Sequence, residues 1–428
     1  MKIKNKLNFI LSVACSFVAV CATAFALAMS YLHGKVIYIN NQDDFLKIYD
    51  NLSARYIVNA DTGINITVPW VPIGTEEKPF TGYIDFNHRN IILSKGYDTN
   101  YISNSSENGI INLGLFGVNK GTIRNVVLQD PKLSSSYDWD KIENNVKINY
   151  GSVCAINNGI LSQNRTNIKE IKFGNNFGET NIGGICGINN GEISACSTLG
   201  HFSVTSNSFT NVGSVCAIMN KGARLNYCYK DGYAFYTLDY PNSNAGYCVG
   251  LCKGGVFSNI GLSYGLDNNS KDIIRLNSSH KSSLVYCGVL IGKIEAEEDI
   301  KIENVVCDFK LETYLDNLFF GFISGKVFDN NFNIYIKNAC FSGIISNSTS
   351  SSANKAGLIF GEYEKKENAK IENLFYYSLE NGFLNFDYFG FQESNFNNLT
   401  LDLLQLDKDF WIKGNFHFYL NYEEVKNI

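Results

Sequence analysis

Cysteine is the residue type whose spacing first suggests chemistry. Of the 12 cysteines, Cys15 and Cys21 lie in an apolar N-terminal run and the other ten follow it. A structural zinc site combines two close pairs of ligands, but Cys248 and Cys252 form one C-x-x-x-C pair without a second. We therefore predict no bound metal. Most of the remaining cysteines recur at fixed positions of a repeat, which favours packing as small buried hydrophobes. These are Cys154, Cys186, Cys216, Cys196, Cys228, Cys307 and Cys340.

The acidic residues form no recognisable catalytic pair. A glycosidase needs two carboxylates about 5 to 9.5 Å apart on one groove, and we find no acids at matching positions of adjacent repeats. The run from Glu295 to Asp299 has the ligand type of a hard-cation site, but a solvated loop is the simpler prediction. A polysaccharide lyase would also need a basic catalyst beside calcium-binding Asp residues, whereas the arginines lie at unrelated repeat positions.

No other motif predicts a reaction. The five histidines are scattered and none begins an H-E-x-x-H motif, and the Ser-rich loops lack a G-x-S-x-G nucleophile elbow. The GLCKGG stretch at 250–255 lacks the lysine and hydroxyl positions of a phosphate-binding loop. We predict no catalytic, cofactor-binding or metal-binding residue, and hence a protein that is not an enzyme.

Composition limits the class of partner. The 428 residues are 45% hydrophobic and 18% charged, with a formal net charge of −5. A large core is possible, and its surface must be covered mainly by uncharged polar groups. Because no basic stripe is present, nucleic acid is excluded as a partner.

The N-terminus predicts export. MKIKNK carries three lysines, and residues 7–32 that follow are uncharged and mostly apolar. A basic start before an apolar run is typical of a signal peptide, and about 20 apolar residues also suffice to span a bilayer. We assign 1–33 as a signal peptide or a membrane anchor; lipid attachment at Cys21 is a further alternative. Basic residues before the run place the body outside the cytosol, where disulfides are also possible.

One phrase occurs three times: NYGSVCAINNG at 149–159, NIGGICGINNG at 181–191 and NVGSVCAIMNKG at 211–222. Aligning the chain on its cysteine gives one position every 30 to 42 residues. The aligned positions are Phe116, Cys154, Cys186, Cys216, Val249, Ile291, Ser324 and Phe360. Glycine at the end of each N-x-G segment is expected to adopt a positive φ.

A second element, I-x-N, follows the phrase. Its asparagines are Asn125, Asn259, Asn304, Asn338 and Asn373. In the middle repeats Gln163 and Ala195 replace the asparagine, and we align Asn226 with it, with Arg224 in the isoleucine position. We expect the asparagines to stack at one corner and to hydrogen-bond through their amides.

Units of this length cannot bury an apolar face alone, but stacked units share one continuous core. The pattern therefore predicts an all-β parallel β-solenoid of about eight repeats over 80–376. The alternative, an array of β-sandwiches, needs units of about 100 residues. We expect an N-terminal cap at 34–79, with a short helix in QDDFLKIYDNL at 42–52, and a C-terminal cap at 377–428.

The GLFG stretch at 114–117, followed by VNKGTIRNVVL, resembles the bacterial GLUG repeat, named for Gly-Leu-any-Gly. The lead-in is similar too, with WVPIGT at 70–75 and FTGYID at 80–85. Phe86 and His88 stand where the family usually has glycine, so the corner after Asp85 should differ in shape.

The C-terminal stretch with Asp409-Phe410-Trp411 is similar to the closing segment of such proteins, and the resemblance spans roughly 38–422. It implies a right-handed β-helix on an exported bacterial surface protein. Members of this family are often adhesin-like or form part of larger secreted enzymes, and the resemblance implies no catalytic residue.

Three functions remain open. The first is a non-enzymatic protein displayed on the bacterial envelope, or secreted if the signal is cleaved, that contacts a host or cell-surface ligand such as a glycan. The second is a carbohydrate-active lyase or hydrolase, or an accessory domain of one. The third is an envelope spacer. The membrane is a partner through residues 7–32 if they remain attached.

Overall fold

A computed structural model describes most of the chain after residue 34. The described ranges are 35–129, 142, 145–168, 170–173, 178–263, 273–280, 283–328, 331–349, 351–381, 386–387, 392–394, 396–413 and 418–420. The predicted hydrophobic N-terminal helix, signal peptide or anchor at 1–33 lies outside these ranges. In the part that the structure describes, no helix is both long and apolar enough to cross a bilayer.

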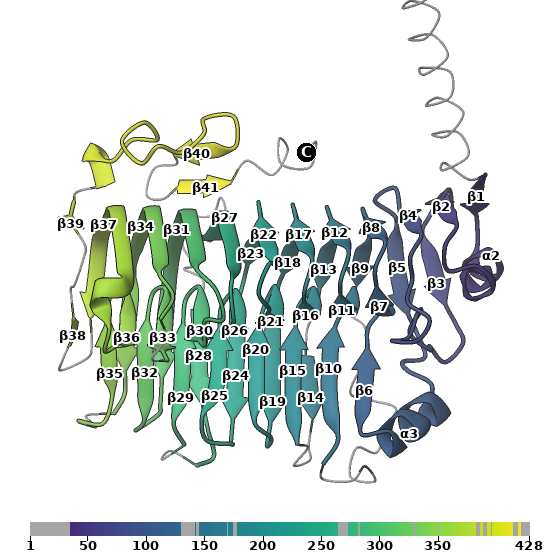
Figure 1. The fold of residues 1–428 in the computed structure, drawn as a ribbon, viewed down its shortest axis with the longest axis horizontal. Coiled ribbons are helices and arrows are strands. Elements are labelled where there is room, and N and C mark those ends of the chain that lie inside the picture. The colour runs from purple at the N-terminus through teal and green to yellow at the C-terminus, as the bar shows by residue number, and fades with distance from the viewer. Residues whose placement is uncertain are drawn as a thin grey trace, which may run out of the picture.

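The chain folds as a parallel β-solenoid, as predicted (Figure 1); it has about seven turns, whereas about eight repeats were expected. Its longest sheet has 22 strands. These are β1 (Val36–Ile39), β2 (Arg55–Val58), β3 (Ile64–Ile66), β4 (Tyr83–Asp85), β5 (Asn90–Leu93), β8 (Thr122–Arg124), β9 (Val127–Gln129), β12 (Ile160–Ser162), β13 (Arg165–Asn167), β14 (Glu170–Phe173), β17 (Glu192–Ser194), β18 (Ser197–Leu199), β19 (Phe202–Ser206), β22 (Arg224–Asn226), β23 (Tyr229–Asp231), β24 (Ala234–Leu238), β27 (Gly255–Ser263), β28 (Ile273–Asn277), β31 (Ile300–Thr313), β34 (Ile334–Asn347), β37 (Ala369–Asn381) and β39 (Gln392–Glu393).

Two shorter parallel sheets complete each turn. The nine-stranded sheet contains β6 (Ile110–Leu113), β10 (Lys147–Gly151), β15 (Glu179–Gly183), β20 (Thr210–Gly213), β25 (Ser243–Gly246), β29 (Val285–Gly288), β32 (Leu318–Gly321), β35 (Lys355–Gly357) and β38 (Phe386–Asp387). The eight-stranded sheet contains β7 (Phe116–Asn119), β11 (Cys154–Asn157), β16 (Cys186–Asn189), β21 (Cys216–Met219), β26 (Val249–Cys252), β30 (Ile291–Ile294), β33 (Ser324–Val327) and β36 (Phe360–Glu362).

The predicted repeat alignment is confirmed rung by rung. Cys154 pairs with Phe116 on one side and with Cys186 on the other, and the pairing continues to Cys216. The looser part of the alignment, from Val249 onwards to Phe360, is in register as well. A repeated core position therefore becomes one column of side chains along the axis.

The I-x-N corner is confirmed as a left-handed turn. All eight residues at this corner have φ between 51° and 60°, in the region that asparagine tolerates better than most residues. They are Asn125, Gln163, Ala195, Tyr227, Asn259, Asn304, Asn338 and Asn373. From Asn259 to Asn373 the side-chain amides form a hydrogen-bonded ladder with N–O distances of 3.0 to 3.1 Å.

The predicted alignment was wrong by one residue at Asn226. Leu225 pairs with Phe257, so Leu225 occupies the isoleucine position and Tyr227 the corner. Asn226 still joins the ladder, because the Nδ2 of Asn259 donates to its Oδ1 at 3.1 Å. Asn226, the neighbour of the corner residue Tyr227, thus makes the amide hydrogen bond that was expected from the corner residue.

The positive φ expected for the N-x-G glycines is confirmed at Gly222, with φ of 74°, and is wrong for the other two repeated phrases. Of the residues concerned, Gly159 and Gly191 do not have a positive φ. Glycine is needed there because turns approach closely: a Cβ on Gly159 would lie 2.2 Å from the carbonyl oxygen of Gly121. The first asparagine of this segment, Asn157, is fully buried.

The N-terminal segment begins the stack. Strands β1 and β2 pair with each other, and β2 pairs with β4, so the solenoid extends closer to the N-terminus than the predicted boundary at residue 80. The expected short helix is α2 (Gln42–Leu46), capped by Asn41 and followed by the 3₁₀ helix η1 (Lys47–Asp50). Phe45 from α2 packs on Trp70 with ring centroids 5.7 Å apart and covers the end of the core.

One helix was not predicted. Residues 80–376 were expected to be almost free of helix, but α3 (Thr99–Glu107) lies there, with Asp98 as its N-cap. Two further 3₁₀ turns are η3 (Lys366–Asn368) and η4 (Phe396–Asn398).

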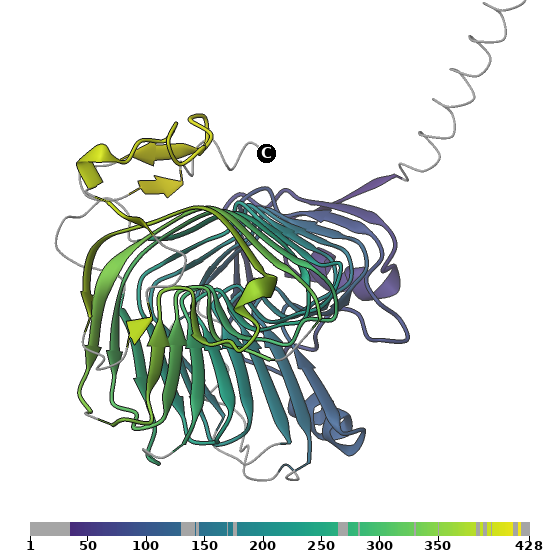
Figure 2. The same cartoon turned by 60° about the vertical axis from the view of Figure 1, so that its left-hand side comes forward.

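The end of the chain forms an arm that folds back over the side of the solenoid (Figures 1 and 2). We call the described residues of 396–420 the C-terminal arm; it contains the antiparallel pair β40 (Trp411–Lys413) and β41 (Phe418–Leu420). Trp411 and Leu420 share an apolar cluster with Val306 and Cys340. The C-terminal arm belongs to the range predicted as a C-terminal cap, but it lies along a lateral face of the stack.

The ten body cysteines are all buried free thiols. Cys154, Cys186 and Cys216 belong to the main core, as expected from their shared position. Cys340 differs because it faces outwards and is covered by the arm. Burial raises the pKa of the Cys154 thiol to about 12, so these groups are not prepared for nucleophilic chemistry.

Candidate functional site: a hollow on the last three long strands

The acidic run at 295–299 has separate partners rather than a common centre. It forms the turn between β30 and β31. Glu297 pairs with Lys253 at 3.2 Å, and Asp299 accepts a hydrogen bond from the Asn333 backbone at 2.9 Å. Among the described residues no group of three His, Cys, Asp or Glu side chains could hold a metal ion.

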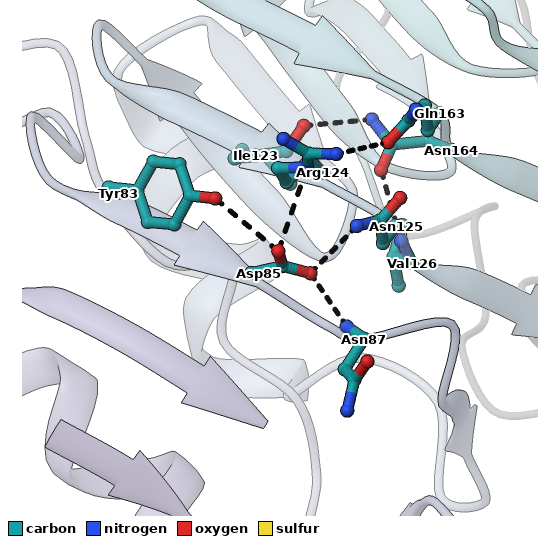
Figure 3. Close-up of polar contacts among 9 residues, drawn as sticks. All are labelled: Tyr83, Asp85, Asn87, Ile123, Arg124, Asn125, Val126, Gln163 and Asn164. Atoms are coloured by element: carbon teal, nitrogen blue, oxygen red, sulfur yellow. Dashed lines mark hydrogen bonds and ion pairs between the residues drawn. The ribbon is translucent and has the colours of Figure 1, made fainter. Parts of the chain in front are cut away.

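The polar corner around Asp85 is satisfied internally (Figure 3). The carboxylate accepts hydrogen bonds from the Asn87 backbone and the Asn125 amide, both at 2.8 Å, and from the Tyr83 hydroxyl at 3.3 Å. Arg124 lies 3.6 Å away as an ion partner. Asn87 and His88 both have a positive φ, so this corner does differ from the single-residue corners of later turns, as expected. These contacts define a structural role at the start of the corner column.

The best candidate site is an open hollow of about 580 Å³ on the outer face of β31, β34 and β37. We call it the Lys–Glu hollow. Its lining residues are Asp299, Lys301, Glu303, Tyr335, Ile336, Lys337, Lys370, Ile371 and Glu372. Alternation along each strand places every second side chain on this outer face.

Parallel register arranges these side chains in two columns. One column contains Lys301, Tyr335 and Lys370. The other contains Glu303 and Glu372 on either side of Lys337. Neighbouring rungs are about 4.8 Å apart, so the two glutamates are separated by about 9.6 Å along the axis.

Part of the Lys–Glu hollow has unused hydrogen-bonding capacity. Lys337 pairs with Glu372 at 3.0 Å, and Lys370 donates to the carbonyl of Glu367 at 2.8 Å. By contrast, the side chains of Lys301, Glu303 and Tyr335 make no hydrogen bond or ion pair with any described residue. All three are exposed, Tyr335 by 38%. A donor and an acceptor on β31 and an aromatic hydroxyl on β34 are therefore free.

A second charged cluster lies where the nine-stranded and eight-stranded sheets adjoin. In earlier turns this junction carries a ladder of buried asparagines, as at Asn211 and Asn244, against aliphatic side chains. In the last turns Tyr286 and Phe319 replace the asparagines. The ammonium of Lys326 lies 5.6 and 5.7 Å from the centroids of these two rings.

This cluster is closed by its own ion pairs. Lys326 contacts Glu362 at 2.6 Å, and Lys355 pairs with the same carboxylate. Burial is the largest single influence and opposes both charges, but the hydrogen bonds and charge attraction among Lys326, Lys355 and Glu362 together outweigh it, so the pKa of Lys326 is raised and the pKa of Glu362 is lowered. Since its rings and charges already have partners, this cluster is a structural counterpart of the asparagine ladder.

The sequence search missed the Lys–Glu hollow, although a signal was present. KIEN occurs at both 301–304 and 370–373. The repeat alignment rests on the isoleucine and the asparagine of this tetrapeptide, and it does not compare the glutamate between them from one repeat to the next. Acids were sought in adjacent repeats only, whereas Glu303 and Glu372 are two rungs apart.

The fold and site define a class: a parallel β-solenoid with an open polar hollow on its outer face. No family model matches the chain, and no curated protein does. One similar solved structure is that of a putative immunoglobulin A1 protease from Bacteroides ovatus, with 14% sequence identity and a TM-score of 0.36 over 91% of this chain and 93% of that one. A similarity this distant carries no argument about activity, and the GLUG resemblance stays an expectation.

Proposed function

We propose that the protein is a contact protein of the bacterial envelope that binds a cell-surface or host glycan through the Lys–Glu hollow. The observation that supports this most is that Lys301, Glu303 and Tyr335 are exposed and have no described partner. Sugars present hydroxyl groups that both donate and accept hydrogen bonds, together with apolar C–H faces that pack on aromatic rings. The three side chains supply a donor, an acceptor and a ring.

The open shape supports contact rather than turnover. A catalytic site excludes water and encloses its substrate, whereas the side chains of the Lys–Glu hollow project from a sheet face and Glu372 is 58% exposed. Weak single contacts become effective when several copies are displayed together, because avidity multiplies them. Export through residues 1–33 would provide that display.

The test uses purified residues 34–428 with glycans and with intact cells. We expect saturable binding that Tyr335→Ala weakens. The matched control is Tyr240→Ala, because Tyr240 is 46% exposed and lies outside the Lys–Glu hollow. Surface labelling of intact producing cells should modify the protein. Binding to no glycan and no cell type, or labelling only after lysis, would reject the proposal.

A second function, glycoside hydrolysis, is favoured by one observation. Glu303 and Glu372 lie two rungs apart, which places their backbone positions about 9.6 Å from each other along the axis, near the upper limit of the range of about 6.5 to 9.5 Å between the carboxyl groups of inverting enzymes. Incubating bound glycan with the body and analysing the products separates the two functions. Intact glycan supports contact, whereas cleavage that is lost in Glu303→Gln supports the hydrolase.

A further inference from the structure

We propose that the Lys–Glu hollow recognises a neutral, linear polysaccharide that lies parallel to the solenoid axis, with three consecutive sugar residues on β31, β34 and β37. This inference rests on the proposed function and specifies its ligand. It depends on the charge balance of the hollow, its spacing and its two ends.

The charges of the Lys–Glu hollow cancel. Its lining contains three lysines and three acidic residues, so its formal charge is 3 − 3 = 0. The acids are Asp299, Glu303 and Glu372. A uronic-acid polymer would be attracted by the lysines and repelled by the carboxylates to a similar extent. A neutral sugar uses both kinds of group, because its hydroxyls accept from ammonium groups and donate to carboxylates.

The spacing favours an axial chain. Rungs repeat about every 4.8 Å, close to the length that one pyranose residue adds to an extended glycan. Each sugar residue of a chain that lies along the axis therefore faces a new pair of side chains, one from each column. A chain along one strand would meet only one pair, such as Lys301 and Glu303, before leaving the hollow.

Both ends of the Lys–Glu hollow limit its length. On the N-terminal side the equivalent positions of β27 are Val256 and Ser258, which carry no charge. On the other side β37 pairs with β39 at Phe375 and Tyr376, beyond the positions of the hollow. Among the described residues three rungs therefore contribute polar side chains to the hollow, which corresponds to three sugar residues.

The roles differ between rungs. Tyr335 occupies the middle rung with an exposed ring, which suits the C–H face of the central sugar. Glu303 on β31 is unpaired and accepts from hydroxyls of the first sugar. Glu372 on β37 is shared with Lys337, so its contribution to the third sugar is smaller.

The experiment measures binding of residues 34–428 to length series of cello-, manno-, xylo- and chito-oligosaccharides, with oligogalacturonides as the anionic comparison. We expect one or more neutral series to bind, with affinity rising up to three residues and then levelling. Raising the salt concentration should change it little, because a neutral ligand releases no counterions. Glu303→Gln should weaken binding about tenfold or more, as expected for loss of a charge-assisted hydrogen bond.

A position-specific control makes the geometry testable. Glu372→Gln should weaken the trisaccharide and leave the disaccharide unchanged, while Tyr240→Ala should affect neither. Preference for oligogalacturonides, affinity that is complete with one sugar, or equal effects of Glu372→Gln on both lengths would overturn the inference and leave glycan contact intact. Absence of binding to every series and to cells would instead reject the proposed function itself.

Discussion

Replacing Asn157 with alanine tests whether buried amide ladders hold the turns in register. Asn157 is fully buried at the end of β11. Its Nδ2 donates to the Oδ1 of Asn189 at 2.8 Å, and its Oδ1 accepts from Asn119 at 2.8 Å and from the Gly159 backbone at 3.2 Å. The substitution removes partners from the turns on both sides as well as from its own turn.

The expected cost follows from the groups left without partners. One N–H of the buried Asn119 amide and the part-buried N–H of Gly159 lose their acceptor. Each unsatisfied buried group costs about 1 to 3 kcal/mol, so we expect a loss of roughly 3 to 4 kcal/mol in the free energy of unfolding. The neighbour Asn158 is exposed, so Asn158→Ala should cost about 0.5 kcal/mol.

The assay is urea unfolding followed by circular dichroism, combined with hydrogen exchange of the peptide containing Gly159. Repeat proteins unfold by coupled units, so midpoints are compared only where the m-values agree. The Asn157→Ala variant should show a lower midpoint and faster exchange at Gly159. Equal midpoints for the Asn157→Ala and Asn158→Ala variants would refute the argument that the ladder stabilises the stack.

Three further predictions follow from the core, the arm and an ion pair. Because burial raises the pKa of Cys154 to about 12, iodoacetamide at about pH 8 should leave it unmodified until the protein unfolds; labelling of the native protein would contradict this. Leu420→Asp should detach the C-terminal arm and make Cys340 reactive to a thiol reagent, whereas Leu403→Asp, at a position 46% exposed, should not; equal reactivity would refute the covering role. Hydrogen bonds from Lys310 and Arg275 lower the pKa of Glu312, so its contribution to stability is present above its unfolded pKa and is lost as pH falls through the folded value. Glu312→Gln should therefore destabilise the protein at neutral pH and match the wild type in acid; a constant difference would contradict this.

The repeat could be predicted from the sequence because stacking maps one core position onto one column. Cys154, Cys186 and Cys216 share a slot in the sequence and the same rung position in space. The corner asparagines could be predicted for the same reason, since a left-handed turn favours asparagine. At Tyr227 this prediction failed, because the neighbouring Asn226 supplies the ladder contact and removes the demand on the corner residue.

Features outside the repeat could not be predicted in the same way. The arm packs through Leu420 against Gly261, where a Cβ would lie 3.2 Å from the leucine Cδ1. This contact joins residues far apart in sequence and belongs to no repeated phrase. The Lys–Glu hollow could have been found from the two KIEN tetrapeptides, but only by treating outward positions as columns too. Its free groups become visible once the partners of Lys337 and Lys370 are known.

Hydroxyl-radical footprinting of residues 34–428, with and without a bound neutral trisaccharide, tests the central claim most directly. Tyr335 and Tyr240 are exposed by 38% and 46% and serve as probe and reference. Contact through the Lys–Glu hollow predicts that the glycan protects Tyr335 and leaves Tyr240 unchanged, and that the trisaccharide is recovered intact. Protection elsewhere with Tyr335 still fully reactive, or recovery of shortened sugar, would contradict the account.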